Sequence, residues 1–285
     1  MIMSIGFDIG GTKINVVRVE DGKIIKSTHV STDKSTPEAF IKQLKDLAVE
    51  FGGDLPIGIG IAGQVDNKRG LLFFAPNIGF KDLEIRKELG LSNVFLLNDV
   101  RAAGMAEWRY GEGIGVSNFI TLFLGTGIGG MIVANGKILE GFQNLAGEIG
   151  HITVDFKGDK CTCGAIGCIE TLASGWGIAK RVGVKTAKEA LEKGAPQITE
   201  EATIALALLI KSLINLNNPE KIILGGGLLK GYLSIYPDFI KQLEEKVKQE
   251  ALKNYQVKLV VSKLSENSPA LGAATFALES FKNGI

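Results

Sequence analysis

The sequence has little of what marks a secreted, membrane-spanning or nucleic-acid-binding protein. Its 285 residues include only three cysteines, an odd number that does not suit a secreted disulfide framework. Lys and Arg total 32 against 31 for Asp and Glu, so no basic excess is available to bind nucleic acid. The longest apolar run, residues 204–210, is far shorter than the roughly 20 residues that span a bilayer, and no basic-then-apolar leader opens the chain. These absences predict a cytoplasmic protein without a membrane or nucleic-acid partner.

Glycine, in contrast, is abundant. The chain holds 37 glycines, well above the average share of about 7%. They gather in short turns at residues 10–11, 125–130 and 225–227. Because glycine lets a backbone approach a ligand closely, these turns indicate ligand contacts.

The hydrophobic pattern predicts an α/β protein with two similar halves. Apolar runs at 3–8 and 14–19 flank a glycine turn, which is typical of a hairpin, and 119–124 and 131–134 repeat that pattern around a second turn. The repeat is short, so duplication remains one of two readings. Further strands are predicted at 57–62, 94–97, 221–224 and near 257–262. Helices are predicted after Thr36 as N-cap, at 101–110, near 200–217 and 237–252, and from Pro269.

Two glycine motifs imitate nucleotide-binding fingerprints without meeting their requirements. Gly125, Gly127 and Gly130 match G-x-G-x-x-G, but that motif needs a helix directly afterwards, and residues 131–134 indicate a strand. Gly6 and Gly11 have P-loop spacing, but residues 12–13 reverse the required Lys-Ser/Thr order. What remains at 8–13 is either a plain hairpin turn or a turn whose N–H groups face phosphate. In the second case Asp8 would lie beside hydrated Mg²⁺.

All three cysteines gather close to one of the two histidines. Cys161, Cys163 and Cys168 fall within eight residues, and His151 lies ten positions before the first of them. Three thiolates and one imidazole form a closed ligand set for tetrahedral Zn²⁺, with no open position for chemistry. A redox Cys-x-Cys pair is the competing interpretation. The other histidine, His29, is expected to be an ordinary strand residue.

Eight segments in order make the chain resemble the ROK family of sugar kinases and related repressors. They are DIGGTK at 8–13, GIGIAGQVD at 58–66, APNIGF at 75–80, LNDVRAA at 97–103, LGTGIGG at 124–130, GEIGH at 147–151, CTCGAIGCIE at 161–170 and GGG at 225–227. The resemblance implies the actin/hexokinase-like (ribonuclease H-like) fold, with two α/β domains and an interdomain cleft. We expect a small domain at 1–107 plus 269–285 and a larger one at 108–268, which carries the zinc loop. A homodimer or higher homo-oligomer is also expected.

The resemblance further implies transfer of the γ-phosphate of ATP, bound with Mg²⁺, to a sugar hydroxyl. The expected acceptor is glucose or a broad set of hexoses, giving the 6-phosphate; N-acetylmannosamine, N-acetylglucosamine, allose and fructose are alternatives. Carried over by matching position, Asp99 is the general base and contacts the sugar. The other sugar-binding positions are Asn77, Asn98, Glu148, His151 and Glu170. The nucleotide-binding positions are Asp8, Gly10, Gly11, Thr12, Lys13, Gly125, Thr126, Gly127, Gly225, Gly226 and Gly227. The structural zinc ligands are His151, Cys161, Cys163 and Cys168.

Three alternatives accompany this interpretation. Without the family context Asp99 could be no more than the N-cap of the helix at 101–110. A ROK-type repressor would carry a DNA-binding module ahead of DIGGTK, which begins here at residue 8, so a repressor is not expected. A sugar-binding protein without catalysis is disfavoured by Asp8 and Asp99. Arg101 departs from the family pattern, and its guanidinium is expected to favour the ionised form of Asp99.

Overall fold

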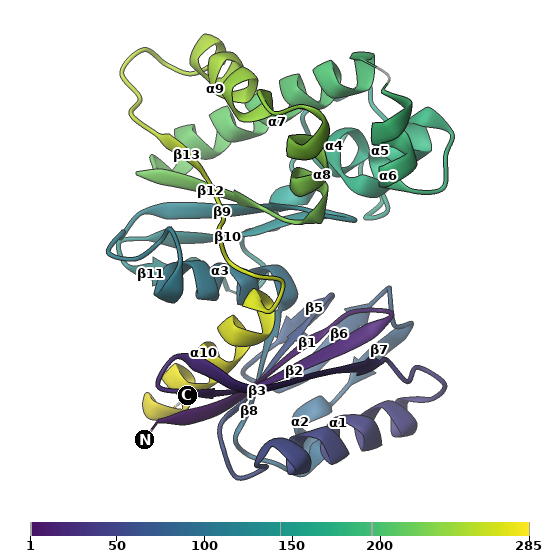
Figure 1. Ribbon diagram of the computed structural model, residues 1–285, viewed down its shortest axis with the longest axis vertical. Coiled ribbons are helices and arrows are strands. Elements are labelled where there is room, and N and C mark those ends of the chain that lie inside the picture. The colour runs from purple at the N-terminus through teal and green to yellow at the C-terminus, as the bar shows by residue number, and fades with distance from the viewer. Residues whose placement is uncertain (1, 143, 195, 285) are drawn as a thin grey trace. The chain divides into compact units, whose positions relative to one another are not determined.

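The chain folds into two compact units, each with its own sheet. The structure is a computed structural model that describes residues 2–142, 144–194 and 196–284. Unit 1 comprises Met1–Ile114, Glu140–Ala146 and Lys263–Ile285, and unit 2 comprises Gly115–Leu139 and Gly147–Ser262 (Figure 1). Among the described residues, no helix combines the length and the apolar character needed to cross a membrane.

The sheet of unit 1 has five strands in the order β3-β2-β1-β4-β8. Their bounds are β1 (Met3–Ile9), β2 (Lys13–Glu20), β3 (Lys23–Ser31), β4 (Ile57–Ile61) and β8 (Val94–Asn98). The first three form an antiparallel meander, and β1, β4 and β8 run parallel. The carboxyl ends of these parallel strands therefore share one edge of the sheet, where ligands commonly bind in α/β proteins. A separate small antiparallel sheet joins β5 (Gln64–Asp66), β6 (Leu71–Ala75) and β7 (Phe80–Leu83).

Helices cover both faces of this sheet. They are α1 (Pro37–Phe51), α2 (Ile85–Leu89), α3 (Asp99–Tyr110) and α10 (Ser268–Lys282). Ile5 and Phe7 point into the same core as the apolar stripe of α1. Gly6 lies between them and so faces the other way, towards α10. A Cβ on Gly6 would come within 1.8 Å of the Ala270 carbonyl oxygen. α10 thus packs directly on the sheet backbone.

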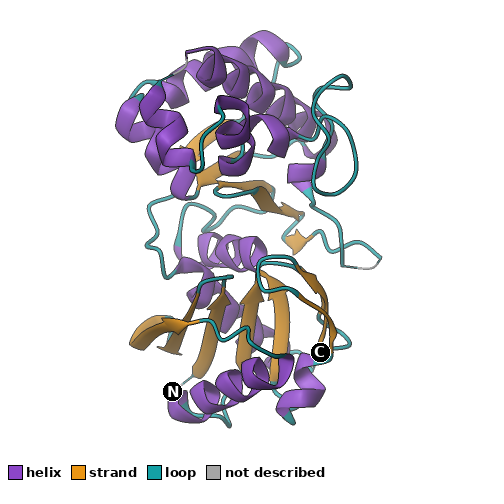
Figure 2. Cartoon of the chain, turned by 90° about the vertical axis from the view of Figure 1, so that its right-hand side faces the viewer, coloured by secondary structure: helices purple, strands orange, loops and turns teal. Residues whose placement is uncertain are grey.

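Unit 2 repeats the strand pattern of unit 1. Its sheet has the order β11-β10-β9-β12-β13, with an antiparallel hairpin of β9 and β10 followed by parallel β12 and β13. The bounds are β9 (Phe119–Leu124), β10 (Ile128–Ala134), β11 (Lys137–Ile138), β12 (Lys221–Gly225) and β13 (Lys258–Val261). Its helices, purple in Figure 2, are α4 (Ile169–Ala173), α5 (Gly175–Val182), α6 (Ala187–Lys193), α7 (Pro196–Asn217), α8 (Gly227–Ile235) and α9 (Phe239–Glu250), with a 3₁₀ turn η1 (Ile149–His151). The shared strand order agrees with two similar halves.

Most of the longer predicted elements are confirmed. α1 begins at Pro37, and the Thr36 hydroxyl accepts the Ala39 N–H at 3.1 Å as the predicted N-cap. A strand follows each of the two glycine motifs that imitate fingerprints, as the sequence indicated. The helix expected at 101–110 begins two residues earlier, and its N-cap is Asn98. The assignment of Asp99 as the cap is therefore wrong.

The unit boundaries lie near the predicted domain boundaries but do not coincide with them. The expected changes were at 107/108 and 268/269, whereas the compact units change at 114/115 and 262/263, and Glu140–Ala146 belongs to unit 1. Positions 1 and 285 of the predicted small domain lie outside the described residues. The predicted domain division itself stays a prediction.

Candidate functional site

The turn between β1 and β2 packs against a predicted sugar-binding residue. The Gly10 N–H donates to the Lys13 carbonyl at 3.0 Å and closes the turn, and the Thr32 hydroxyl donates to the Gly10 carbonyl at 2.8 Å. A Cβ on Gly11 would lie 2.5 Å from the Asn77 carbonyl oxygen and 2.9 Å from the Asn77 Cβ. Glycine is therefore needed at position 11 because the Asn77 backbone occupies the space of a side chain. This contact brings the predicted phosphate turn and a predicted sugar residue together.

Two carboxylates meet at the carboxyl edge of the same sheet. Asp8 pairs in register with Gly60 of β4, and Asp99 opens α3 directly after β8. A Cβ on Gly60 would lie 3.7 Å from the Asp99 Cα, so the small residue on β4 leaves room between the two acids. Burial, followed by the negative charge of Asp99, raises the pKa of Asp8 from 3.8 to about 7, against the opposing effect of the Lys13 ammonium. Asp99 is therefore close enough to make ionisation of Asp8 less favourable.

The α3 N-terminus fixes the backbone of Asp99. The Asn98 side chain accepts the Val100 N–H at 3.0 Å and donates to the Gly63 carbonyl at 3.1 Å. Asn98, a predicted sugar-binding residue, is thus also the helix cap. A carboxylate in the first turn is stabilised by the free N–H groups and the dipole of the helix.

Arg101, in the first turn of α3, binds the segment Glu140–Ala146 of unit 1. Its guanidinium donates to the Asn144 side-chain oxygen at 2.8 Å and to the Ala146 carbonyl. Arg101 is buried, with only 9% of its surface exposed. Its departure from the family pattern therefore has a structural use, since it holds the chain that leads into Gly147 and Glu148.

In unit 2, the predicted zinc ligands converge. The ligand atoms of His151, Cys161, Cys163 and Cys168 all lie within 4.8 Å of one another. Cys161 Sγ is 3.7 Å from His151 Nδ1, and Cys163 Sγ is 3.6 Å from Cys168 Sγ. Ligands at 2.3 Å on a tetrahedral ion stand about 3.8 Å apart, so these separations suit Zn²⁺. They are too long for a disulfide, whose sulfurs are about 2.05 Å apart.

The chemistry of the cysteines also fits a cation. Burial raises the pKa of the Cys168 thiol to about 12, so its thiolate is disfavoured without a compensating charge. A hydrogen bond from the Ala165 backbone lowers the pKa of Cys163. Zn²⁺ supplies the positive charge that such a mixed set of thiols needs for ionisation. His151 faces the cysteines with Nδ1, which leaves Nε2 for another partner.

Glu170 is the second residue of α4 and contacts the second glycine turn. One carboxylate oxygen, Oε1, accepts the Ile128 N–H at 2.7 Å, and a Cβ on Gly127 would lie 2.4 Å from the same oxygen. The other, Oε2, accepts the Trp176 indole N–H at 3.3 Å. Glu170 was predicted only as a sugar residue. Its observed contacts tie it to the turn predicted to bind phosphate.

Backbone hydrogen bonds join that turn to the start of α5. The Gly175 N–H donates to the Gly125 carbonyl at 2.9 Å, and the Trp176 N–H donates to the Thr126 carbonyl at 3.1 Å. Ser174 caps α5 by accepting the Gly177 N–H at 3.1 Å. The second glycine turn and the corner between α4 and α5 therefore form one bonded assembly.

A cavity of about 820 Å³ opens beside this assembly. Its wall combines glycine backbone, apolar side chains and two lysines, contributed by Gly125, Thr126, Gly175, Trp176, Ala179, Lys185, Thr186, Ala187, Lys188, Leu191, Glu192, Gly227, Leu228, Gly231, Ser234 and Ile235. Gly226, at φ 99°, packs against the end of β9, where a Cβ would lie 2.2 Å from the Leu124 carbonyl oxygen. Gly227 of the triple glycine and Gly125 and Thr126 of the GTG turn therefore line the same cavity. An apolar wall beside cationic side chains suits a nucleoside phosphate.

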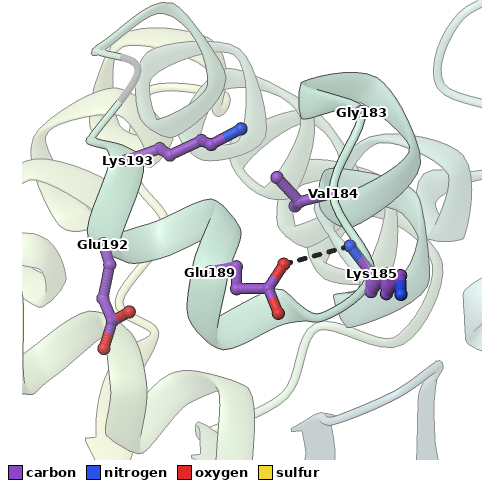
Figure 3. A pocket seen from close by; sticks show the side chains of 6 residues that line it. All are labelled: Gly183, Val184, Lys185, Glu189, Glu192 and Lys193. Atoms are coloured by element: carbon purple, nitrogen blue, oxygen red, sulfur yellow. Dashed lines mark hydrogen bonds between the residues drawn. The ribbon is translucent and has the colours of Figure 1, made fainter.

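A smaller hollow of about 500 Å³ adjoins the cavity and shares Lys185 and Glu192 with it. Figure 3 shows the Glu189 carboxylate turned towards the Lys185 backbone N–H, 3.2 Å away. Thr186 caps the same helix, α6, by accepting the Glu189 N–H at 3.2 Å. Glu189, one of the two acids that line the hollow, thus helps to fix the N-terminus of α6 on the cavity wall.

The predicted site residues fall into two sets, one in each unit. Unit 1 holds the turn at 8–13 with Asn77, Asn98 and Asp99, and unit 2 holds the two later glycine turns with Glu148, His151 and Glu170. Glu148 and His151 lie at either end of η1, where the His151 N–H donates to the Glu148 carbonyl at 3.1 Å. Sequence reasoning missed Trp176. Its signal is a helix start, Ser174-Gly175, a few residues after Glu170.

Comparison with known proteins agrees with the resemblance seen in the sequence. A family model described as the ROK family matches residues 4–280. A glucokinase from Thermotoga maritima is 32% identical over 96% of this chain and 97% of its own length. The crystal structure of a ROK hexokinase from Thermus thermophilus superposes with a TM-score of 0.86 at 29% identity, over 99% of this chain and 100% of that one.

A second structure, a ROK family glucokinase from Streptomyces griseus in complex with glucose and AMPPNP, has a TM-score of 0.78 at 28% identity and covers 97% of this chain and 99% of its own. These neighbours confirm the predicted actin/hexokinase-like fold class. With a family model that matches nearly its whole length, and with both glycine turns and the Cys₃His group in place, the chain belongs to the ROK family.

Proposed function

We propose that this protein is an ATP-dependent sugar kinase that phosphorylates a hexose hydroxyl, with glucose or a broad set of hexoses as acceptor and the 6-phosphate as product. The observation that carries the proposal is the placement of Asp99 at the start of α3, beside Asp8 and the glycine turn of β1 and β2. The glucokinase relative and the neighbour solved with glucose and AMPPNP support the same reaction.

In this proposal Asp99 is the general base. Its carboxylate accepts the proton of the sugar hydroxyl while the hydroxyl oxygen attacks the γ-phosphorus and the bond to the β-phosphate oxygen breaks. Mg²⁺ bound with ATP would neutralise charge on the phosphates, and we assign Asp8 as the carboxylate that would hold the hydrated ion. Because phosphoryl transfer depends mainly on positioning, the N–H groups of the turns contribute by fixing the phosphates.

We assign the remaining residues by their units. Asn77 and Asn98 from unit 1, and Glu148, His151 and Glu170 from unit 2, bind sugar hydroxyls. Residues 10–13 and 125–127 bind phosphates, and residues 225–227 approach the nucleoside. The ligand geometry of the Cys₃His group supports a structural Zn²⁺ that fixes the His151 ring through Nδ1 and leaves Nε2 for a hydroxyl.

Release of ADP over a panel of hexoses and amino sugars tests the proposed reaction. We expect ADP release with glucose, and phosphate on the 6-hydroxyl of the product by NMR. Faster turnover with N-acetylmannosamine, N-acetylglucosamine, allose or fructose would replace the acceptor but keep the reaction. No sugar-dependent ADP release across the panel would contradict the kinase assignment.

A further inference from the structure

Trp176 is the one side chain that meets both the cavity and Glu170 among the described contacts of unit 2. It lines the 820 Å³ cavity together with the glycine turns. Its indole N–H is turned to Glu170 Oε2, 3.3 Å away. An aromatic ring in a mostly apolar pocket is a suitable partner for a planar base or a ribose.

Glu170 in turn is held from two sides. Ile128 of β10 donates to one carboxylate oxygen and Trp176 to the other. Only 9% of the Glu170 surface is exposed, and hydrogen bonds to a buried carboxylate are stronger than those between neutral groups. The direction of this carboxylate therefore depends on where the indole lies.

We propose that Trp176 is a positioning residue that couples the nucleotide cavity to sugar binding. A nucleotide in the cavity packs on the indole and fixes it, and the fixed indole N–H holds Glu170 in the orientation that accepts the sugar. Without nucleotide the indole has more freedom, and Glu170 is less well placed. This inference rests on the proposed function, because it takes a nucleoside phosphate as the occupant of the cavity and a hexose as the ligand of Glu170.

The coupling has a defined signature. By linkage, a nucleotide that tightens sugar binding is itself bound more tightly in the presence of sugar, by the same factor. The hydrogen bond at stake has a charged acceptor, so its loss should change this factor by about tenfold. A residue with a merely structural role would change both affinities without changing the factor.

The experiment measures the glucose Kd by calorimetry with and without saturating AMPPNP and Mg²⁺. In the unmodified protein we expect AMPPNP to tighten glucose binding by about tenfold. In W176F, which keeps an aromatic ring and lacks the N–H donor, this factor should fall close to one. W108F replaces the other tryptophan, in α3 of unit 1, and should retain the full factor.

A second measurement does not depend on the folding of W176F. In W108F the only tryptophan is Trp176, and its emission should change when AMPPNP is added without sugar. An unchanged emission, or a W176F protein that folds and retains the tenfold factor, would overturn the coupling while leaving the kinase assignment intact. Absence of ADP release over the whole panel would instead overturn the proposed function, and this inference with it.

Discussion

At the scale of single residues, the site depends on side chains whose backbone positions leave them little freedom. Asn98 caps α3 with its side-chain oxygen and binds the Gly63 carbonyl with its amide nitrogen. Position 11 requires glycine because the Asn77 backbone fills the space of a side chain. These contacts hold the backbone next to the carboxylates of the site in one position. Catalysis by positioning requires such a fixed backbone.

The first residue-scale prediction concerns Asp99. D99N keeps the size of the side chain but cannot accept a proton, so kcat should fall by about 10²- to 10⁴-fold. Steady-state ADP release measures this, and AMPPNP binding by calorimetry should remain close to that of the unmodified protein. A variant with the full rate would remove the assignment of Asp99 as the base.

The second concerns the pH dependence of stability through Asp8. Its pKa in the folded protein is about 7, above the unfolded value of 3.8, so the folded state binds a proton more tightly. The resulting stabilisation is fully present below pH 3.8 and is lost as the pH rises through 7. In D8N this loss is absent, so the variant should gain stability relative to the unmodified protein between pH 5 and pH 8. Urea unfolding without nucleotide or Mg²⁺ measures it, and equal pH slopes for the two proteins would contradict the assignment.

At the scale of elements, the close contact between α10 and the first sheet is the feature most sensitive to change. Gly6 on β1 and Gly58 on β4 both face α10, and a Cβ on either would lie 1.8 Å from a helix carbonyl oxygen, that of Ala270 or Ala273. The backbone on both sides cannot give way easily.

We therefore predict that G6A destabilises the protein by about 3 kcal/mol or more, as severe overpacking does. The matched control is G53A, in the turn after α1, where the nearest atoms to an added Cβ are 3.7 Å away. Its effect should stay within about 0.5 kcal/mol. Chemical unfolding of both variants gives the comparison, and equal stabilities would show that α10 can shift to admit a methyl group.

The sequence predicted long, regular elements well and short ones badly. The hairpins of β1 with β2 and of β9 with β10 have alternating apolar residues around glycine, and α1 has a Thr-Pro start, so local chemistry specifies them. The exposed strand β3 and the short helices α4, α5 and α6 carry no comparable pattern. Their positions depend on tertiary contacts instead. Two of these short helices hold site residues, Glu170 in α4 and Trp176 in α5. This is why the role of Trp176 was not visible in the sequence.

Features of the site were likewise predictable only where residues near in sequence determine them. The cysteine spacing predicted the Cys₃His group, because three thiolates and an imidazole so near in sequence have few other uses. The contacts of Glu170 and Arg101 were not predictable, since both depend on segments far away in the chain, near residues 128 and 144. The expectation that Arg101 favours the ionised form of Asp99 stays a prediction.

At the scale of the whole molecule, the metal group and the second glycine turn belong to one unit, and the first glycine turn belongs to the other. Cys168 directly precedes α4, and Glu170 in that helix binds the turn at 125–128. Loss of order at the Cys₃His group should therefore extend through α4 to the turn at 125–128, within unit 2.

Removal of the proposed zinc ion tests this. After treatment with a chelator, amide hydrogen exchange should accelerate at residues 147–173 and at the turn 125–128, with tenfold faster exchange for each 1.4 kcal/mol of lost local stability. The strands of unit 1 should exchange at their original rates and serve as the internal control. Faster exchange confined to residues 151–168 would show that the metal supports its own loop alone, and an equal change in unit 1 would contradict an effect limited to unit 2.

The position of α10 has a consequence for synthesis on the ribosome. The sheet of unit 1 begins at Met3, yet the helix that covers one of its faces ends at Lys282. Unit 2, which ends at Ser262, can therefore complete its core while the face of β1 and β4 that bears Gly6 and Gly58 is still bare. Unit 1, whose strands emerge first, is thus the last to be finished, and a chain that lacks α10 would be the form most in need of a chaperone.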